Sequence, residues 1–329
     1  MAIISNAQSR LAGVQADLAA TFQRDFPIYK EMQEAFLFYL PYTTIRNAPY
    51  AFKDRIPFPR PYPYGKGRDH QGFKDRLINV GLIPFELTLG WDRRDALDDQ
   101  LKDLERHVST GMQRYFQLPD VLIGEYMSGV AAYNIDGLQL CFDGVSLYSA
   151  TDGDGAARFG VTGGNIITGQ GVSTTARVMS DIIKIRRRFL EMKEPVTNQP
   201  LHNSKDIVYN NIHYIIPAHL DGIFSQIQEQ ELIYSDPTIV NSQSNMLKGK
   251  IKYTINQRLS ADSNSFFAVL KADYWRPFAY RAPQDVNTIF ATIQNSDRSR
   301  EFAEDGFYSD MRIGIAPWCP FTTVKNNND

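Results

Sequence analysis

A change of hydrophobic period near residue 90 separates a strand from a long helix. Residues 85–89 alternate apolar and polar side chains, as a half-buried strand does, in Phe85-Glu86-Leu87-Thr88-Leu89. From Asp92 onward the apolar positions recur at helical spacing and form one stripe over about five turns. The stripe comprises Leu97, Leu101, Leu104, Val108, Met112 and Tyr115. We therefore predict a long amphipathic helix from residue 92 that Pro119 ends or kinks, followed by a second helical run over 120–127.

Helical and strand periods also mark the second half of the chain. Residues 176–193 form an amphipathic pattern that Ser173 or Thr174 can cap, closed by Pro195. Its inward positions are Val178, Ile182, Ile185, Phe189 and Met192. A second helix is predicted over 218–230, and strands over 139–144, 146–149, 212–216, 250–255, 266–270 and 311–316. Helical segments followed by mixed and then strand-rich segments are typical of an α+β fold.

The segment 51–80 lacks the pattern of an ordinary strand. Pro57, Pro59, Pro61 and Pro63 remove alternate backbone donors and fix φ, so we expect a stiff, extended arm that cannot pair as a sheet edge. The arm has seven basic and three acidic residues, a net charge of +4, whereas residues 92–105 have six acidic and three basic residues. The two segments are electrostatically complementary but lie too close in sequence to fold back on each other. We therefore expect a partner subunit to supply the match.

Composition indicates a soluble globular protein without a global charge signature. The chain has 329 residues, 43% hydrophobic and 22% charged, with a formal net charge of −2, which gives no sign of general polyanion binding. The start of the sequence lacks the basic and apolar regions of a signal peptide, and no apolar run is long enough for a transmembrane helix. Cys141 and Cys319 are predicted to be buried thiols of a protein made in a reducing compartment.

The candidate catalytic, cofactor and metal sites do not have the residue spacing of known motifs. The glycines of 160–171 match no phosphate-binding fingerprint, so a flexible surface loop is favoured. Asp152-Gly153-Asp154-Gly155 begins like a calcium loop but has no glutamate at the twelfth position, which favours a turn. The five histidines show no zinc spacing and are interpreted as surface or packing residues. We predict no catalytic residue, no metal and no cofactor, and hence no enzyme.

The sharpest basic run is Arg186-Arg187-Arg188 on the polar face of the predicted helix 176–193. Glu191 and Glu194 share that helix segment, so a solvated face is favoured over a nucleic-acid site. A contact with an acidic neighbour fits the run equally well.

Several short motifs, in order from residue 38 to residue 278, resemble the Mu-like phage major head subunit family, which has the Hong Kong 97-like capsid fold. The most specific segment is Phe85-Glu86-Leu87-Thr88-Leu89-Gly90 followed by Arg93-Arg94-Asp95-Ala96-Leu97. The others are Phe38-Tyr39-Leu40-Pro41-Tyr42, Leu118-Pro119-Asp120, Phe142-Asp143-Gly144, Ile215-Ile216-Pro217-Ala218 and Trp275-Arg276-Pro277-Phe278. The proline ladder at 57–63 is denser than expected for this family, which suggests a rigid strut in place of a plain hairpin.

The resemblance implies a division of the chain. The expected parts are an N-terminal arm (1–48), an extended loop (49–91), a peripheral domain with the spine helix (92–149), an axial domain (150–250), and returning peripheral strands with part of the axial domain (251–329). The implied function is that of a major capsid protein, forming hexamers and pentamers of an icosahedral bacteriophage shell around double-stranded DNA.

The resemblance also implies partners and a location. The expected partners are further copies of the chain, a separate scaffolding protein, a portal, a decoration protein, and packaged DNA through weak non-specific contact, with no membrane. The expected location is the virion, assembled in the host bacterial cytoplasm.

Charge patterning gives a hypothesis for the contact between subunits. The basic arm would lie over the acidic helix of a neighbouring copy, each exposed pair contributing less than about 1 kcal/mol. The candidate contact residues are Arg55, Arg60, Tyr62, Tyr64, Lys66, Arg68, Asp95, Asp98, Asp99 and Asp103. The alternatives are a soluble α+β enzyme with an unrecognised site and a nucleic-acid-binding protein using Arg186 to Arg188.

Overall fold

A computed structural model describes most of the chain. The described residues are 36–53, 75–92, 101–134, 137–194, 198–234, 242–261, 264–271, 275–283, 287–291, 297–302 and 304–328. The proline ladder at 57–63 lies outside them.

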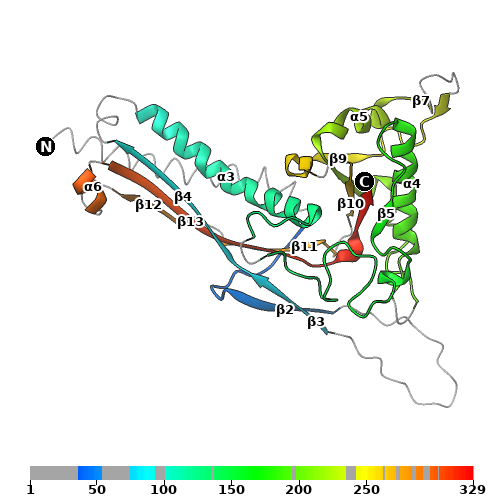
Figure 1. Cartoon of the computed structure of the whole chain (residues 1–329), viewed down its shortest axis with the longest axis horizontal. Helices are drawn as coiled ribbons and strands as arrows, with labels where there is room; N and C mark the ends of the chain where they lie inside the picture. The colour runs from blue at the N-terminus through cyan, green and yellow to red at the C-terminus, as the bar shows by residue number, and fades with distance from the viewer. Residues whose placement is uncertain are drawn as a thin grey trace, which may run out of the picture.

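One sheet is organised around a single long strand. β13 (Glu304–Pro317) pairs antiparallel with β4 (Ile83–Asp92), with β12 (Asn287–Ala291) and with β11 (Phe278–Arg281), and β1 (Leu37–Tyr39) pairs parallel with β11. The long helix α3 (Leu101–Ser128) runs along this sheet (Figure 1). The short helix α6 (Asp297–Phe302) lies at the far end, beside β12.

A second sheet lies at the opposite end of the molecule. Its strand order is β5-β14-β10-β6-β9. The strands are β5 (Ile166–Thr168), β14 (Thr323–Asn327), β10 (Phe266–Leu270), β6 (Ile212–Ile216) and β9 (Lys252–Ile255). Helices α4 (Thr175–Glu191) and α5 (Asp221–Glu229) accompany this sheet (Figure 1).

The strand β10 connects the two halves of the molecule because its two faces belong to different hydrophobic clusters. Phe266, Ala268 and Leu270 pack in the cluster that contains α4 and α5. Phe267 and Val269 pack in the cluster that contains α3 and β13. A strand buried on both faces reads as a continuous apolar run, which explains its sequence Phe-Phe-Ala-Val-Leu.

Two hairpins project from this body. β2 (Asn47–Lys53) pairs antiparallel with β3 (Asp75–Gly81), with Asn47 opposite Gly81 and Lys53 opposite Asp75 in the register. The two ends of the segment 51–80 therefore pair as strands, which corrects the prediction that this segment cannot do so. The smaller hairpin joins β7 (Leu232–Tyr234) to β8 (Ser242–Ser244). In Figure 1, β2 and β3 lie on the side of the sheet away from α3.

Several sequence-based predictions are confirmed. The helix predicted over 176–193 is α4, Thr174 caps it by accepting from the backbone N–H of Arg177, and all five predicted inward residues are buried. The strands predicted over 212–216 and 266–270 are β6 and β10 with the same bounds. The mixture of helices and strands agrees with the α+β prediction.

The helix predicted to start near Asp92 does not include this residue, and residues 93–100, where such a start would fall, lie outside the described residues. Asp92 is the last residue of β4, where it lies opposite Glu304 of β13. The alternation of Phe85, Leu87 and Leu89 continues to Trp91, and this face packs in the cluster of α3. Long-range pairing with β13 therefore extends the strand beyond the five residues that the pattern marked.

Of the two outcomes predicted at Pro119, an end or a kink, the end is wrong, because α3 continues through this proline to Ser128. The helical run predicted over 120–127 is confirmed as the last part of α3. Pro119 and the turns after it are buried, and Leu122 and Met127 are almost fully enclosed. Tertiary packing therefore offsets the missing backbone donor. The segments 139–144 and 146–149 contain no strand, and the helix predicted over 218–230 begins with the 3₁₀ turn Ala218–Leu220 before α5.

Candidate assembly surfaces

The predicted contact residues between subunits lie almost entirely outside the described part of the chain. This applies to Arg55, Arg60, Tyr62, Tyr64, Lys66, Arg68, Asp95, Asp98 and Asp99. Asp103 falls in the first turn of α3, where only the backbone is described. The contact between the basic arm and the acidic helix stays a prediction.

The described part does place the base of the arm. The hairpin β2–β3 is closed by a hydrogen bond from Leu82 N to Arg46 O at 2.8 Å. Ala48, Ile78 and Val80 are buried, so the base packs into the body. Gly314 of β13 permits this contact, since a Cβ there would lie 2.4 Å from Gly81 O and 3.1 Å from Val80 Cγ1. The base of the arm is therefore held against β13 by close backbone packing.

The helix α3 is fixed on its sheet by polar contacts as well as apolar packing. The Tyr115 hydroxyl donates to Ser309 O at 2.9 Å, and the Tyr126 hydroxyl donates to Ile315 O at 2.9 Å. Burial raises the pKa of both phenols, so they remain protonated donors at neutral pH. The two tyrosines thus tie α3 to two points along β13.

Acidic side chains lie opposite one another on the face of the sheet turned away from α3. The register of β4 and β13 places Glu86 opposite Asp310 and Asp92 opposite Glu304. All four residues are exposed, and Arg298 binds Glu304 at 3.0 Å. Like charges directly opposite each other are destabilising in a sheet unless neighbouring groups compensate them, as Arg298 does for Glu304. Sequence reasoning missed this surface because only the register brings the residues together.

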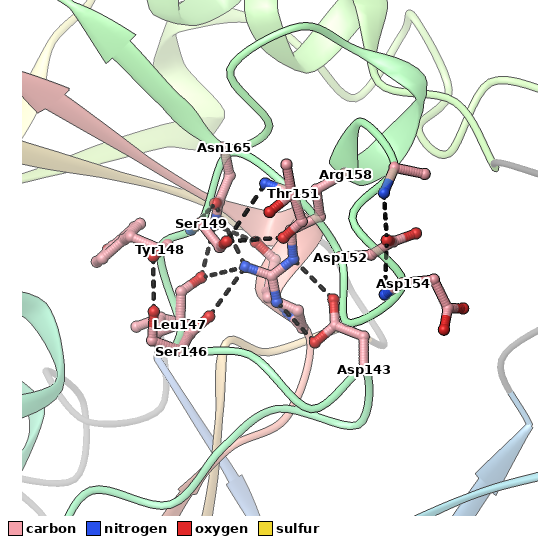
Figure 2. A network of polar contacts seen from close by, with 12 residues as sticks. Asp143, Ser146, Leu147, Tyr148, Ser149, Thr151, Asp152, Asp154, Arg158 and Asn165 are labelled. Atoms are coloured by element: carbon pink, nitrogen blue, oxygen red, sulfur yellow. Dashed lines mark hydrogen bonds and ion pairs between the residues drawn. The ribbon is translucent and has the colours of Figure 1, made fainter.

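A buried arginine organises the loops between α3 and α4. Figure 2 shows Arg158 directed at Asp143, with Nε to Oδ2 at 2.8 Å and Nη2 to Oδ1 at 3.1 Å. Nη1 donates to Ser146 O at 3.0 Å and to Leu147 O at 2.8 Å. The side chain is 1% exposed. This network holds residues 143–147 in the absence of regular strands there.

The glycine-rich segment 160–171 is not the surface loop that its composition favoured. It contains β5, which pairs parallel with β14, and the fully buried Asn165. Asn165 Nδ2 donates to Leu147 O at 2.8 Å and to Pro320 O at 3.2 Å. The predicted turn at Asp152 is confirmed, because its Oδ1 accepts from the backbone of Asp154 and Ala156.

The basic run on α4 is largely used within the chain. Arg186 Nε donates to Ile207 O at 3.0 Å, and its guanidinium lies 5.1 Å from the centre of the Tyr209 ring. Arg188 donates to Thr162 O at 2.6 Å. Only Arg187 matches the predicted solvated face, in an exposed pair with Glu191 at 2.6 Å. These contacts argue against the run as a nucleic-acid site.

A pocket of about 580 Å³ lies between α3 and the turn after β9. Its lining includes Phe36, Arg114, Asp120 and Arg258. Burial raises the pKa of Asp120 to about 6, and no described residue donates a hydrogen bond to its carboxylate. Asn256 Nδ2 instead donates to the backbone oxygen of Asp120 at 3.2 Å.

The histidines and cysteines that the structure describes in detail have packing roles. His202 bonds Phe321 O at 2.8 Å and His213 bonds Thr254 Oγ1 at 2.6 Å. Burial lowers the pKa of both rings, that of His213 to about 4. Cys141 and Cys319 are buried free thiols, as predicted. Within the described ranges, no cluster of three or more metal-ligating side chains occurs, and no helix has the length and apolar character of a membrane span.

The fold of this chain is similar to those of chains in solved capsid structures. The capsid of an empty GTA particle matches with a TM-score of 0.56 at 12% identity, covering 90% of this chain and 88% of the other. The capsid of cyanophage P-SCSP1u matches with a TM-score of 0.53 at 9% identity, again covering 90% and 88%. The mature capsid of bacteriophage PhiM1 matches with a TM-score of 0.51 at 8% identity, covering 89% and 85%.

The chain has a capsid fold. The expected Hong Kong 97-like fold is thereby confirmed, since the similarity extends over most of the chain. No family model and no curated protein matches the sequence. The finer resemblance to the Mu-like head subunits and the division into five parts stay predictions.

Proposed function

We propose that the chain is a major capsid protein, which assembles with copies of itself into the hexamers and pentamers of an icosahedral bacteriophage shell around double-stranded DNA. The observation that carries this proposal is the fold likeness to capsid subunits over 90% of the chain. The protein acts as a structural component of the virion, without enzymatic activity.

We propose that neighbouring subunits of the shell contact each other through the basic arm. The proposed contact places the basic arm (Arg55, Arg60, Lys66 and Arg68, with Tyr62 and Tyr64) over the acidic residues Asp95, Asp98, Asp99 and Asp103 of a neighbouring copy. The acidic pairs on β4 and β13 add negative charge to the same half of the molecule. Each exposed pair contributes less than about 1 kcal/mol, but repetition across the shell sums many such contacts.

Assembly also requires other components. A separate scaffolding protein, a portal and a decoration protein are the proposed protein partners, and assembly takes place in the host bacterial cytoplasm. The near-neutral net charge of −2 fits weak, non-specific contact with packaged DNA, because a strongly basic inner wall would retain it.

The size of the purified protein tests the capsid function. We expect ring-shaped oligomers or megadalton shells by size-exclusion chromatography and electron microscopy. A stable monomer or dimer with or without co-expressed scaffolding protein would contradict the proposal.

Charge reversal tests the contact separately. Substituting glutamate at Arg55, Arg60, Lys66 and Arg68 should suppress assembly at least tenfold while the circular dichroism spectrum stays that of the folded subunit. Lysine at Asp95, Asp98, Asp99 and Asp103 in the same chain should restore it, since the pairs are then exchanged. Normal shells from the arm variant alone would refute this contact and leave the capsid function standing.

A further inference from the structure

A second buried arginine, Arg281, lies where the extended hairpin meets the body. It is the last residue of β11 and is 0% exposed. The residues before it, Phe278, Ala279 and Tyr280, are all buried apolar side chains, so the strand carries a single cation into the interior. A buried cation is costly unless its donors are satisfied.

The donors of Arg281 reach both sides of the hairpin base. Nη1 donates to Val80 O of β3 at 3.0 Å. Nη2 donates to Ile45 O and to Thr43 Oγ1, each at 2.5 Å, and also to Thr43 O. The segment 43–45 leads into β2, so one guanidinium joins the chain entering the hairpin to the strand leaving it.

Nε of Arg281 is buried without a hydrogen-bond partner among the described residues, and two aromatic rings lie near the guanidinium. The guanidinium carbon of Arg281 lies 6.0 Å from the ring centres of Tyr42 and Tyr50, at the outer limit of a cation–π contact. The Tyr50 hydroxyl donates to Pro41 O at 2.8 Å, which holds its ring beside the approach to β2. The hydrogen-bond partners of Arg281 among the described residues are thus carbonyl and hydroxyl oxygens of the hairpin base.

This arrangement is sensitive to the direction of the hairpin. A strand rises about 3.3 Å per residue, so the stretch from Asn47 to Lys53 spans roughly 20 Å, and a tilt of about 10° at its base displaces the far end by about 3 Å. A planar guanidinium on β11 that is bonded to both segments of the hairpin base, 43–45 and β3, resists such a tilt, whereas a lysine ammonium has fewer donors and no fixed plane.

We propose that Arg281 is a positioning residue for assembly, which sets the direction in which the β2–β3 hairpin leaves the body and presents its loop to a neighbouring copy. A buried charge with neutral acceptors adds little net stability, and a role in fixing one geometry explains why it occupies this position. Its consequence for assembly rests on the proposed function, but its effect on the hairpin can be measured in the single subunit.

The test uses Arg281→Lys, with Arg158→Lys as the matched control, because both arginines are buried and bind backbone carbonyls. Amide hydrogen exchange of the soluble full-length subunit is measured by mass spectrometry. Arg281→Lys should raise exchange in Asn47–Lys53 and Asp75–Gly81 at least tenfold and leave β10 unchanged. Arg158→Lys should raise exchange in 141–167 and leave the hairpin unchanged.

Assembly of the same variants gives the second readout. Arg281→Lys should lower the yield of regular particles at least tenfold, whereas Arg158→Lys should retain assembly at temperatures where it is folded. Unchanged exchange in the hairpin, or an equal rise in every element, would overturn the proposal. Should Arg281→Lys fail to fold, Thr43→Val removes one acceptor and should raise exchange in the hairpin alone, by a smaller factor.

The outcomes separate the two proposals. If the hairpin loosens as expected but the wild-type chain forms no particles under any condition, the capsid function fails and the positioning role of Arg281 stands as a property of the fold. If the wild-type assembles and Arg281→Lys assembles equally well despite a loosened hairpin, the role in assembly is refuted.

Discussion

The two buried arginines solve the same physical problem in different ways. Arg158 is 1% exposed and pairs with a carboxylate, Asp143, that is itself 12% exposed. Arg281 is fully buried, and it donates hydrogen bonds to oxygens of Thr43, Ile45 and Val80. Arg158 connects loops within one half of the molecule, whereas Arg281 connects the body to a projecting hairpin.

The difference indicates two kinds of structural role. An ion pair that loses one partner leaves an uncompensated buried charge, so Arg158 and Asp143 depend on each other for stability. Carbonyl oxygens that lose a donor retain only a desolvation cost, so the loss of Arg281 should be felt less in global stability and more in local geometry. Arg158 therefore contributes mainly to the stability of the fold, and Arg281 sets the direction of the β2–β3 hairpin.

Replacing each arginine by methionine should separate these roles most strongly. Arg158→Met leaves the Asp143 carboxylate and two carbonyls without their donor, so we expect the free energy of unfolding to fall by about 4 kcal/mol. Arg281→Met leaves only neutral acceptors and should cost about 2 kcal/mol. Urea denaturation followed by circular dichroism measures both. An equal or larger loss for Arg281→Met would contradict the distinction.

A smaller effect than that of Arg158→Met is expected from Gly314→Ala, where β13 contacts the base of the hairpin. The new Cβ would lie 2.4 Å from Gly81 O, which forces β3 away from β13. Overpacking of this kind costs about 2 kcal/mol. Gly90→Ala on β4 is the matched control, since no described residue lies within 4 Å of a Cβ added there. Thermal unfolding of both variants checks the prediction. Equal melting temperatures would show that β13 and the hairpin base are not closely packed at Gly314.

The smallest expected effect concerns Asp120, whose carboxylate accepts no hydrogen bond from the residues that the structure describes. Its pKa in the folded chain is about 6, above the ordinary value of 3.8, so the folded state holds the proton more tightly than the unfolded state. Stability should therefore fall as pH rises from about 4 to about 6, by up to roughly 2 kcal/mol. Asp120→Asn should remove this dependence and raise stability at pH 7.

Urea unfolding at a series of pH values measures the effect of Asp120. His213 acts with the opposite sign, because its lowered pKa makes the folded state lose stability as pH falls from about 6.5 to about 4. The difference between Asp120→Asn and wild type isolates the carboxyl from this background. A pH-independent difference would show that Asp120 is not the titrating group.

Local patterns were sufficient where an element has one buried face or is buried throughout. The apolar stripe of α4, its threonine cap and the apolar run of β10 are each defined by residues that lie close together in the sequence. The basic run at Arg186 to Arg188 was visible too, but its acceptors, such as Ile207 O and Thr162 O, were not. A sequence pattern identifies the side chain that can donate a hydrogen bond. It does not identify the acceptor, which can come from a distant segment.

The two arginines carried a weak signal that sequence reasoning missed. Each is a charged residue beside apolar neighbours, in Arg158-Phe159 and in Phe278-Ala279-Tyr280-Arg281. Such a charge can end an exposed strand or lie buried, and the sequence does not distinguish the two cases. The decision depends on whether acceptors from distant segments meet it, and Val80 lies 201 positions from Arg281.

The sequence by itself determined the α+β class, the core faces of α4 and β10, and a capsid-like order of elements. Periodicity encodes the fold class and the core faces because they depend on neighbours within a few residues, whereas the capsid-like order was inferred from the resemblance of short motifs to a known family. Only the tertiary structure decided the length of β4, the passage of α3 through Pro119, the acidic pairs across β4 and β13, and the roles of Arg158 and Arg281. These depend on strand register and on burial by distant segments, which local periodicity does not record.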